Sequence, residues 1–170
     1  ADAASDVWKT LELDGLILSG GNTLVDYADV KNTTEGLCAE RDAYEQALMK
    51  VALSTCAPIL GVCRGMQVIN IYYNGQLKKI KGHAGKRHCL IREDSAIGFN
   101  FPSEVNSFHD YAVPRKNLGQ SLISLAHDVE DNIEALCNPK DKVLGIMWHP
   151  ERENPTLQTD RELIKEHFGL

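Results

Sequence analysis

The segment Gly-Val-Cys-Arg-Gly at residues 61–65 constrains the fold of this chain more than any other stretch. Residues 58–62 form a short apolar run with branched side chains, which is typical of a strand buried on both faces. After this run the apolar residues no longer alternate, and Val68 and Tyr72 share one helical face. The pattern therefore predicts a strand, a sharp turn and a helix, with Cys63 at the turn.

The spacing of the glycines around Cys63 has a mechanical reason. A residue held between a strand end and a helix start adopts a strained backbone, and small neighbours let the chain pack closely around it. The helix N-terminus offers unpaired N–H groups and a positive potential, which lowers the pKa of a thiol. We therefore expect Cys63 to be a reactive nucleophile. The alternative that this motif leaves open is a buried structural cysteine in an ordinary strand-to-helix turn.

Two further candidate catalytic residues follow a second apolar strand, which ends just before His149 and Glu151. A nucleophilic thiol needs a base for its proton, and an imidazole base needs an acceptor that fixes its tautomer. Cys63, His149 and Glu151 supply these three groups. His109 is a rival base, but its only evident orienting carboxylate is Asp110.

Three motifs together resemble those of the class I glutamine amidotransferases: LILSGGN at 16–22, GVCRGMQ at 61–67 and WHPE at 148–151. Within that superfamily the chain is most similar to the gamma-glutamyl hydrolase branch, which contains gamma-glutamyl-gamma-aminobutyrate hydrolase. The resemblance covers nearly the whole chain. It implies a single α/β domain over residues 1–170, with three layers and a flavodoxin-like, mostly parallel central sheet between helices on both faces.

The same resemblance implies a reaction, the cysteine-dependent hydrolysis of a gamma-glutamyl amide. The C–N bond would be cleaved through a glutamyl-thioester on Cys63, and glutamate would be released. The backbone N–H groups of Gly21 and Arg64 correspond to the family's oxyanion hole. The family's substrate-binding positions correspond here to Gly20, Gln67, Asn106, Ser107 and His109. The family's reaction requires no metal and no organic cofactor.

Residues 78–88 hold five of the chain's 18 basic residues and two histidines. Flanking glycines predict a loop. One interpretation is a solvated basic loop; the other is that Lys86, Arg87 and His88 contact an anionic leaving group, such as a phosphate or a nucleotide. We do not expect a metal site on His83 and His88, because no carboxylate or cysteine accompanies them at ligand spacing.

The composition limits the cellular compartment and the classes of binding partner that we expect. With 170 residues, 43% hydrophobic and 25% charged, the chain is typical of one soluble globular domain. A net charge of −6 argues against a generic nucleic-acid surface, and no apolar run approaches the ~20 residues of a membrane span. Five cysteines without a disulfide pattern favour a reducing cytoplasm. The expected partner is a small-molecule gamma-glutamyl substrate rather than nucleic acid or a membrane.

Two other functions stay open. The chain could be the glutaminase subunit of an amidotransferase, which delivers ammonia to a partner synthase, although such subunits more often carry an apolar residue where Arg64 stands. It could also be a non-catalytic binding protein on the same fold, although all three catalytic residue types are present. The sequence leaves open a homodimer or a partner domain.

The start of the chain departs from the family pattern. The family fold ordinarily begins with a strand, a helix and a second strand ahead of the Ser-Gly-Gly turn at residues 19–21. Residues 1–12 do not have the pattern of a buried strand. We therefore expect this first strand-helix-strand segment to be missing, because the sheet would otherwise expose a central strand as an edge.

Overall fold

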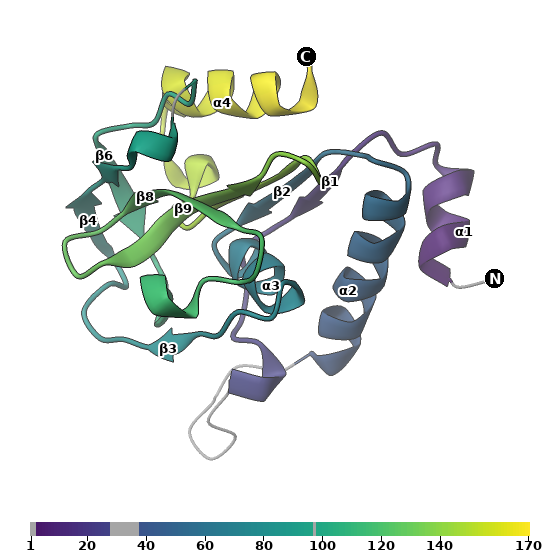
Figure 1. Ribbon diagram of the computed structural model, residues 1–170, viewed down its shortest axis with the longest axis horizontal. Coiled ribbons are helices and arrows are strands. Elements are labelled where there is room, and N and C mark those ends of the chain that lie inside the picture. The colour runs from purple at the N-terminus through teal and green to yellow at the C-terminus, as the bar shows by residue number, and fades with distance from the viewer. Residues whose placement is uncertain (1–2, 28–37, 97) are drawn as a thin grey trace.

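A computed structural model describes residues 3–27, 38–96 and 98–170 of the chain (Figure 1). The strands are β1 (Leu16–Leu18), β2 (Ile59–Val62), β3 (Lys78–Lys79), β4 (Lys86–Cys89), β5 (Ile91–Arg92), β6 (Glu104–Ser107), β7 (Tyr111–Pro114), β8 (Ile123–His127), β9 (Asn132–Asn138) and β10 (Val143–Ile146). The α-helices are α1 (Ala3–Thr10), α2 (Ala39–Ser54), α3 (Arg64–Tyr72) and α4 (Gln158–Phe168).

The main sheet runs in the order β1-β2-β10-β9-β7-β3, and β8 and β5 continue it from β9. Strands β1 and β10 both pair with β2 in parallel, and the remaining ladders are antiparallel. The parallel strands β2 and β10 end side by side, because Val62 lies opposite Ile146. Within the described residues β1 pairs with β2 alone and forms an edge of the sheet.

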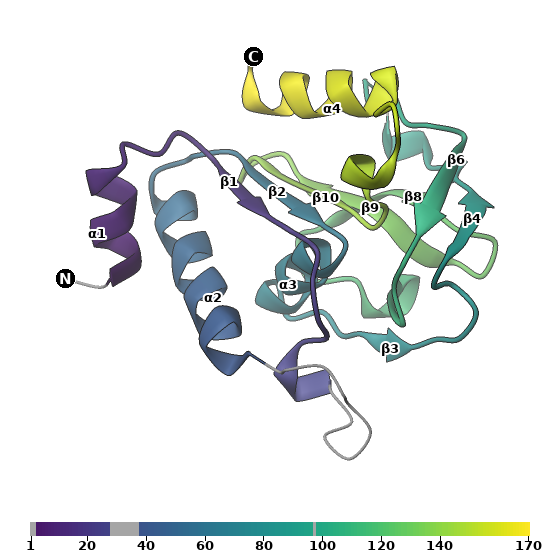
Figure 2. The ribbon, with the colours of Figure 1, turned by 180° about the vertical axis from the view of Figure 1, so that it is seen from behind.

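Helices cover both faces of the sheet, so the predicted α/β fold is confirmed. Helices α2 and α3 lie on one face and α4 lies on the other, while α1 packs beside α2 (Figures 1 and 2). All four residues of β2 are buried, as expected for a strand covered on both sides. The described helices include none that is long and apolar enough to cross a membrane.

The sheet separates two hydrophobic clusters, which hold the strand ends in place. The cluster on the α2 and α3 side includes Met49, Met66 and Ile69. The cluster on the α4 side includes Trp148 and Leu163. Because both faces of the sheet are packed, the carboxyl ends of β1, β2 and β10 form a rigid rim on which side chains can be positioned.

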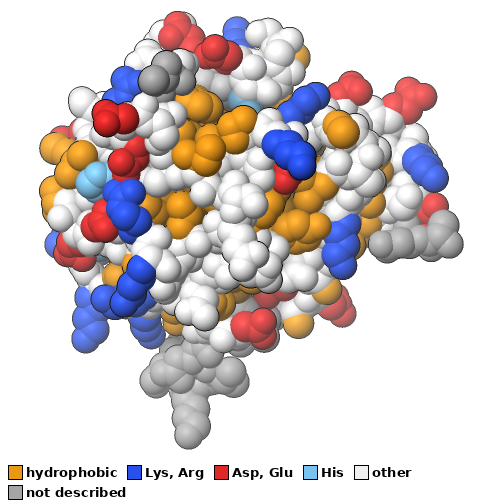
Figure 3. Space-filling model, in the orientation of Figure 1, with side chains coloured by type: hydrophobic (Ala, Val, Ile, Leu, Met, Phe, Trp, Pro, Cys, Tyr) orange, Lys and Arg blue, Asp and Glu red, His pale blue; other side chains and the backbone are white. Residues whose placement is uncertain are grey.

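The basic segment 78–88, which the sequence predicts as a loop, contains two short strands instead. Strand β3 pairs with β7, and β4 pairs with β6 in a separate two-stranded sheet. The partner strands come from residues far along the chain, so local composition could not reveal the pairing. Lysine and arginine side chains gather over this region, at the lower left of Figure 3. The exposed ones in the segment are Lys78, Lys79, Lys81, Lys86 and Arg87.

Candidate active site

Cys63 lies at the turn between β2 and α3, as the sequence predicts. Its φ of 51° and ψ of −106° are unusual for a residue with a side chain. Its N–H donates to the carbonyl of Ile146 at 2.8 Å, which ties the turn to β10. A Cβ on Gly65 would lie 1.9 Å from the carbonyl oxygen of Leu18, so only glycine fits there. The glycine spacing thus allows the helix to start directly against β1.

His149 follows β10, and its imidazole is oriented by Glu151. The ring Nδ1 lies 2.6 Å from Oε1 of Glu151. Because a carboxylate accepts, the hydrogen belongs on Nδ1, which leaves the lone pair on Nε2. Nε2 is buried and makes no hydrogen bond. Gly20 makes room for the ring, since a Cβ there would lie 2.6 Å from Cε1 of His149.

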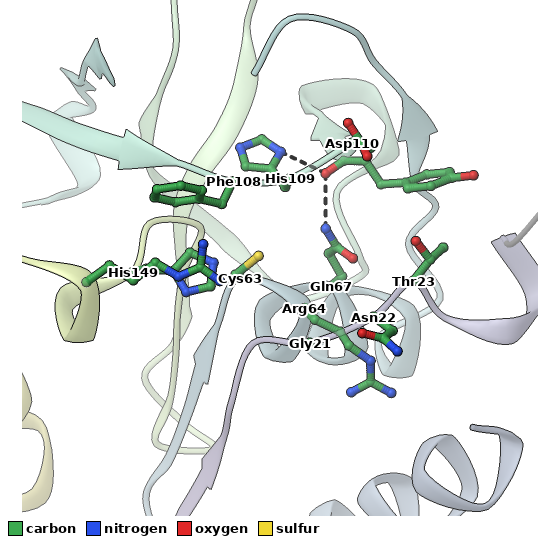
Figure 4. A pocket seen from close by; sticks show the side chains of 12 residues that line it. Gly21, Asn22, Thr23, Cys63, Arg64, Gln67, Phe108, His109, Asp110 and His149 are labelled. Carbon is green, nitrogen blue, oxygen red and sulfur yellow. Dashed lines mark hydrogen bonds between the residues drawn. The ribbon is translucent and has the colours of Figure 1, made fainter. Parts of the chain in front are cut away.

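Cys63 and His149 line one pocket of about 280 Å³ (Figure 4). Its other walls come from residues 21–23 after β1, from the first turn of α3, from residues 108–111 between β6 and β7, and from Arg152. The sulfur, the imidazole and several polar groups therefore face a common space at the rim of the sheet. This arrangement can support nucleophilic attack by a thiol with an imidazole as base.

The thiol of Cys63 does not have the low pKa expected from its place at a helix start. Burial raises the pKa of Cys63 to about 11, and it outweighs the Arg64 N–H that bonds to the sulfur and the nearby charge of Arg152. This direction is opposite to the lowered thiol pKa that the helix start predicts. A thiol with a raised pKa needs a base to remove its proton, and the imidazole of His149 lines the same pocket.

Arg64 contributes only its backbone to the pocket. Its side chain is 3% exposed and forms ion pairs with Asp42 and Glu45 of α2. Figure 4 shows this side chain directed away from the Cys63 sulfur, while its N–H bonds to that sulfur. The ion pairs thus anchor the first residue of α3 to α2.

The turn at Gly20 and Gly21 is held from behind by Arg41, which sequence reasoning did not assign to the site. Its guanidinium donates to the carbonyls of Ser19 and Gly20, at 3.2 Å each. In a trans peptide the C=O and N–H point in opposite directions. The N–H of Gly21 is therefore directed away from Arg41, as an oxyanion donor requires. The indication of this role in the sequence was the group of charged residues in the first turn of α2.

Two of the expected substrate-binding residues, Gln67 and His109, do line the pocket. Gln67 donates through Nε2 to the carbonyl of Tyr111 at 3.0 Å, and Nδ1 of His109 lies 3.0 Å from the same oxygen. Burial lowers the pKa of His109 to about 4. His109 thus adds a neutral ring to the pocket wall, while its other nitrogen faces away from Tyr111.

The structure gives Asn106 and Ser107 other surroundings. Asn106 bonds to the backbone of His149 on both sides, with Nδ2 donating to its carbonyl and Oδ1 accepting from its N–H. Ser107 is buried and lies opposite Lys86 in the β4–β6 ladder. Neither residue is among those that line the pocket. Asn106 therefore fixes the backbone of His149, and it does not line this pocket.

The expectation that Lys86, Arg87 and His88 reach a leaving group does not match their positions, because none of them lines the Cys63 pocket. Arg87 instead forms ion pairs with Glu104 and Glu153, at 2.6 Å each. The ladder between β4 and β6 directs these residues toward a separate, smaller cavity. The basic segment thus makes most of its contacts outside the Cys63 pocket.

Arg152 is the cationic side chain that sequence reasoning missed. It lines the pocket, and its guanidinium carbon lies 4.2 Å from the ring centroid of Phe108. A guanidinium stacked on an aromatic ring is a fixed positive group. Its position directly after Glu151 was the only signal in the sequence.

His83 and His88 do have carboxylates beside them in three dimensions, contrary to the expectation from chain spacing. The fold brings Asp128 and Glu134 to these histidines, and one ligand-type atom from each of the four residues lies within 4.8 Å of the others. Asp128 and Glu134 come from the turn after β8 and from β9. No spacing rule along the chain could have joined them to His83 and His88.

Comparisons with known proteins show which family and which sequences this chain resembles. The sequence model of the Peptidase C26 family matches residues 2–151. A gamma-glutamyl-CDP-amidate hydrolase of Campylobacter jejuni is 34% identical over 158 residues, covering 93% of this chain and 71% of that protein. A glutamine amidotransferase-like protein of Lactococcus lactis is 33% identical over 173 residues, covering 90% and 72%.

Two proteins from Thermoplasma are similar at lower identity. A glutamine-hydrolysing GMP synthase subunit of Thermoplasma volcanium is 26% identical over 159 residues, covering 93% of this chain and 71% of that protein. A solved structure from Thermoplasma acidophilum, assigned as a GMP synthase subunit, superposes with a TM-score of 0.72 at 23% identity, covering 99% of this chain and 76% of that one. At that identity the structural likeness establishes the α/β fold alone.

Proposed function

The chain belongs to the Peptidase C26 family, whose members are hydrolases of amide C–N bonds, and we propose that it cleaves a gamma-glutamyl amide with Cys63 as nucleophile. The observation that carries this proposal is the shared pocket of Cys63 and His149, with His149 oriented by Glu151 at 2.6 Å. A thiol, a base and an orienting carboxylate are the three groups that covalent amide hydrolysis needs.

The reaction begins with proton transfer from the Cys63 thiol to Nε2 of His149. The sulfur then attacks the gamma-carbonyl carbon, and the carbonyl oxygen becomes an oxyanion next to the N–H groups of Gly21 and Arg64. One such donor typically lowers the barrier by about 3 kcal/mol. His149 passes its proton to the leaving nitrogen as the C–N bond breaks, which leaves a glutamyl-thioester on Cys63.

Water completes the reaction. His149, again neutral, takes a proton from a water molecule, whose oxygen attacks the thioester carbonyl. The C–S bond breaks, the sulfur recovers the proton from His149, and glutamate leaves. Glu151 keeps the proton-bearing Nδ1 in place through both halves and stabilises the imidazolium when it forms.

The charged side chains that line the pocket support a substrate with a glutamyl group. A glutamyl group carries an α-carboxylate and an α-ammonium, and the pocket is lined by Arg152 and by Asp110. Opposite charges on its walls suit such a zwitterion. The name of the Campylobacter jejuni relative supports the same class of substrate.

The proposal is tested by measuring glutamate release from a panel of gamma-glutamyl amides. The panel contains GABA, polyamine and nucleotide amidate conjugates, together with glutamine. We expect release from at least one conjugate, a covalent glutamyl adduct on Cys63 in rapidly quenched samples, and neither signal with Cys63→Ala. Cys56→Ser is the matched control, because Cys56 is exposed and lies outside the pocket. Turnover by Cys63→Ala at the wild-type rate would exclude the mechanism.

The rival function is a glutaminase subunit that supplies a synthase, and it is favoured by the sequence similarity to the Thermoplasma volcanium protein. The same panel separates the two functions. A stand-alone hydrolase cleaves conjugates without a partner. A synthase-coupled glutaminase would cleave glutamine only, and strongly only after a partner synthase is added.

A further inference from the structure

A second group of reactive side chains lies beside the pocket, at the end of the sheet where β4, β8 and β9 meet (Figures 1 and 2). It consists of His83, His88, Asp128 and Glu134, which we call the His–carboxylate cluster. One nitrogen or oxygen atom from each of the four residues lies within 4.8 Å of the others. The amide hydrolysis proposed above uses none of these side chains, so they call for a separate explanation.

Glu134 is a buried carboxylate in this cluster whose negative charge is only partly compensated by its neighbours. Its side chain is 1% exposed, and neither carboxylate oxygen makes a hydrogen bond. His88 Nε2 lies 3.3 Å from one of these oxygens and is its ion-pair partner when the imidazole is protonated. Burying a carboxylate is costly, and the neighbours of this one are histidine nitrogens at 3.3 and 3.7 Å, so a bound metal would complete its compensation.

His109 faces the cluster from the side of the Cys63 pocket and places a second hydrogen-bond acceptor next to Glu134. Its Nδ1 lies 3.0 Å from the carbonyl of Tyr111, which requires the ring hydrogen to be on Nδ1. The lone pair of Nε2 then points toward Oε1 of Glu134 at 3.7 Å, and this nitrogen has no hydrogen bond. Two acceptors that face each other in a buried place need a proton or a metal cation between them.

Asp128 is already held in the orientation that a ligand needs. Its Oδ1 accepts hydrogen bonds from the N–H groups of Glu130 at 2.8 Å and Asn132 at 2.9 Å. Its Oδ2 accepts from Nδ2 of Asn132 at 2.9 Å and lies 3.8 Å from Nε2 of His83. Such outer hydrogen bonds are the usual support of a metal-binding carboxylate.

The cluster also has an access route for an ion. A cavity of about 120 Å³ is lined by His83, His88 and Asp128, and Lys86 and Val129 stand at its sides. This cavity is distinct from the Cys63 pocket, of which His109 forms part of the wall. An ion could therefore reach the cluster from outside without passing Cys63.

We propose that the His–carboxylate cluster binds one divalent transition-metal ion, with zinc as the best match. Two imidazoles and two carboxylates suit zinc or cobalt, whereas calcium and magnesium prefer oxygen ligands alone. Ligand atoms around a tetrahedral zinc lie roughly 3.4 Å apart, given bonds of about 2.1 Å. The observed spread of up to 4.8 Å needs only a modest inward adjustment of the side chains.

The metal would have a structural role, because four protein ligands fill a tetrahedral site. It would join the segment that holds His83 and His88 to β9 and to the turn after β8. It would also lie next to His109 and so make one wall of the Cys63 pocket more rigid. Removing it should lower thermal stability and raise KM more than it lowers kcat.

The test is metal binding by the full chain after treatment with a chelator. The stripped protein is given one equivalent of Zn²⁺ or Co²⁺, dialysed, and analysed for metal content, for its melting temperature and for the visible spectrum of the cobalt form. We expect about one metal per chain, a higher melting temperature and a tetrahedral cobalt spectrum. A chain that keeps no metal and melts at the same temperature with Zn²⁺ and with chelator would overturn the proposal.

Two variants locate the ion. Glu134→Gln should lose the metal and the rise in melting temperature, yet melt no lower than stripped wild type, since it removes a buried charge that the neighbouring histidines compensate only in part. His88→Gln is the second test, because His88 is only half-buried and its replacement is less disruptive. Glu130→Gln is the matched control: this exposed residue lines the cavity but lies outside the cluster, and it should bind metal normally.

A cysteine could capture zinc instead, and Cys63→Ala separates that case. The cluster predicts normal metal binding in Cys63→Ala and none in Glu134→Gln. The reverse pattern would place the ion on the catalytic thiol and exclude the cluster. Because metal content and melting temperature do not depend on turnover, this result stands apart from the test of gamma-glutamyl hydrolysis.

Discussion

The side chain of Asn106 forms hydrogen bonds with both the carbonyl and the N–H of His149. Its Nδ2 donates to the His149 carbonyl at 2.9 Å, and its Oδ1 accepts from the His149 N–H at 2.9 Å. Nδ2 also donates to Glu153 at 2.8 Å. Because β6 carries Asn106, the position of His149 depends on a strand of the separate β4–β6 sheet.

Asn106→Ala should therefore lower both stability and kcat. It leaves the His149 N–H without a partner, which costs about 1–3 kcal/mol in the free energy of unfolding, whereas the His149 carbonyl still accepts from the N–H of Arg152 at 3.1 Å. We expect a loss of about 1–3 kcal/mol in urea unfolding and a lower kcat, with KM less affected. Asn106→Asp keeps the acceptor and should lose less stability. Wild-type kcat in folded Asn106→Ala would refute the positioning role.

Glu151→Gln should reduce kcat while leaving the fold intact. The amide can still accept from Nδ1 of His149, but it no longer stabilises the imidazolium by its charge. The Glu151 side chain is 59% exposed, so solvent screens that charge. The loss should therefore be smaller than the ~10⁴-fold typical of a buried triad carboxylate. Steady-state kinetics measure it, with the exposed Glu166→Gln as control.

Arg152→Gln should make the Cys63 thiol less reactive. The Arg152 charge lowers the pKa of Cys63 against the larger effect of burial, so its removal raises that pKa further. Iodoacetamide alkylation of Cys63, followed by peptide mass spectrometry, should slow by about 2- to 10-fold, since one pKa unit is tenfold in thiolate. In wild type the rate should keep rising above pH 9, because the thiol titrates near 11. Unchanged alkylation in Arg152→Gln, judged against Arg161→Gln, would contradict this account.

Arg64→Met should destabilise the chain more than it alters chemistry. It leaves Glu45, which is 8% exposed, without its Arg64 partner. Glu45 keeps its ion pair with Arg41 at 2.8 Å, so the loss should be smaller than the roughly 3–5 kcal/mol typical of a buried charge left with no partner. Adding Glu45→Gln should recover part of that loss in urea unfolding. The kcat of the folded variant should change less, because Arg64 contributes its N–H rather than its side chain to the pocket.

Much of the site could be read from local sequence, and the physical reason is that its backbone geometry is local. Gly61, Cys63 and Gly65 lie within five residues, and the close contact of Gly65 with β1 needs a glycine whatever the rest of the chain does. His149 and Glu151 likewise form their hydrogen bond within three residues. Short-range patterns of this kind predicted the elbow, the strands β2 and β10, and the α/β fold.

Other features depended on segments that meet only in three dimensions. Burial raises the pKa of Cys63, although the helix start alone predicts a lower one. Asn106 reaches His149 across 43 residues of chain, and it positions the base instead of lining the pocket. Asp128 and Glu134 gather around two histidines that looked isolated in the sequence. The chain therefore specified by itself which chemical groups stand at strand ends and turns, because those depend on neighbours. Only the tertiary structure decided which groups are buried, charged or paired, because desolvation and electrostatic contact depend on distances between remote segments.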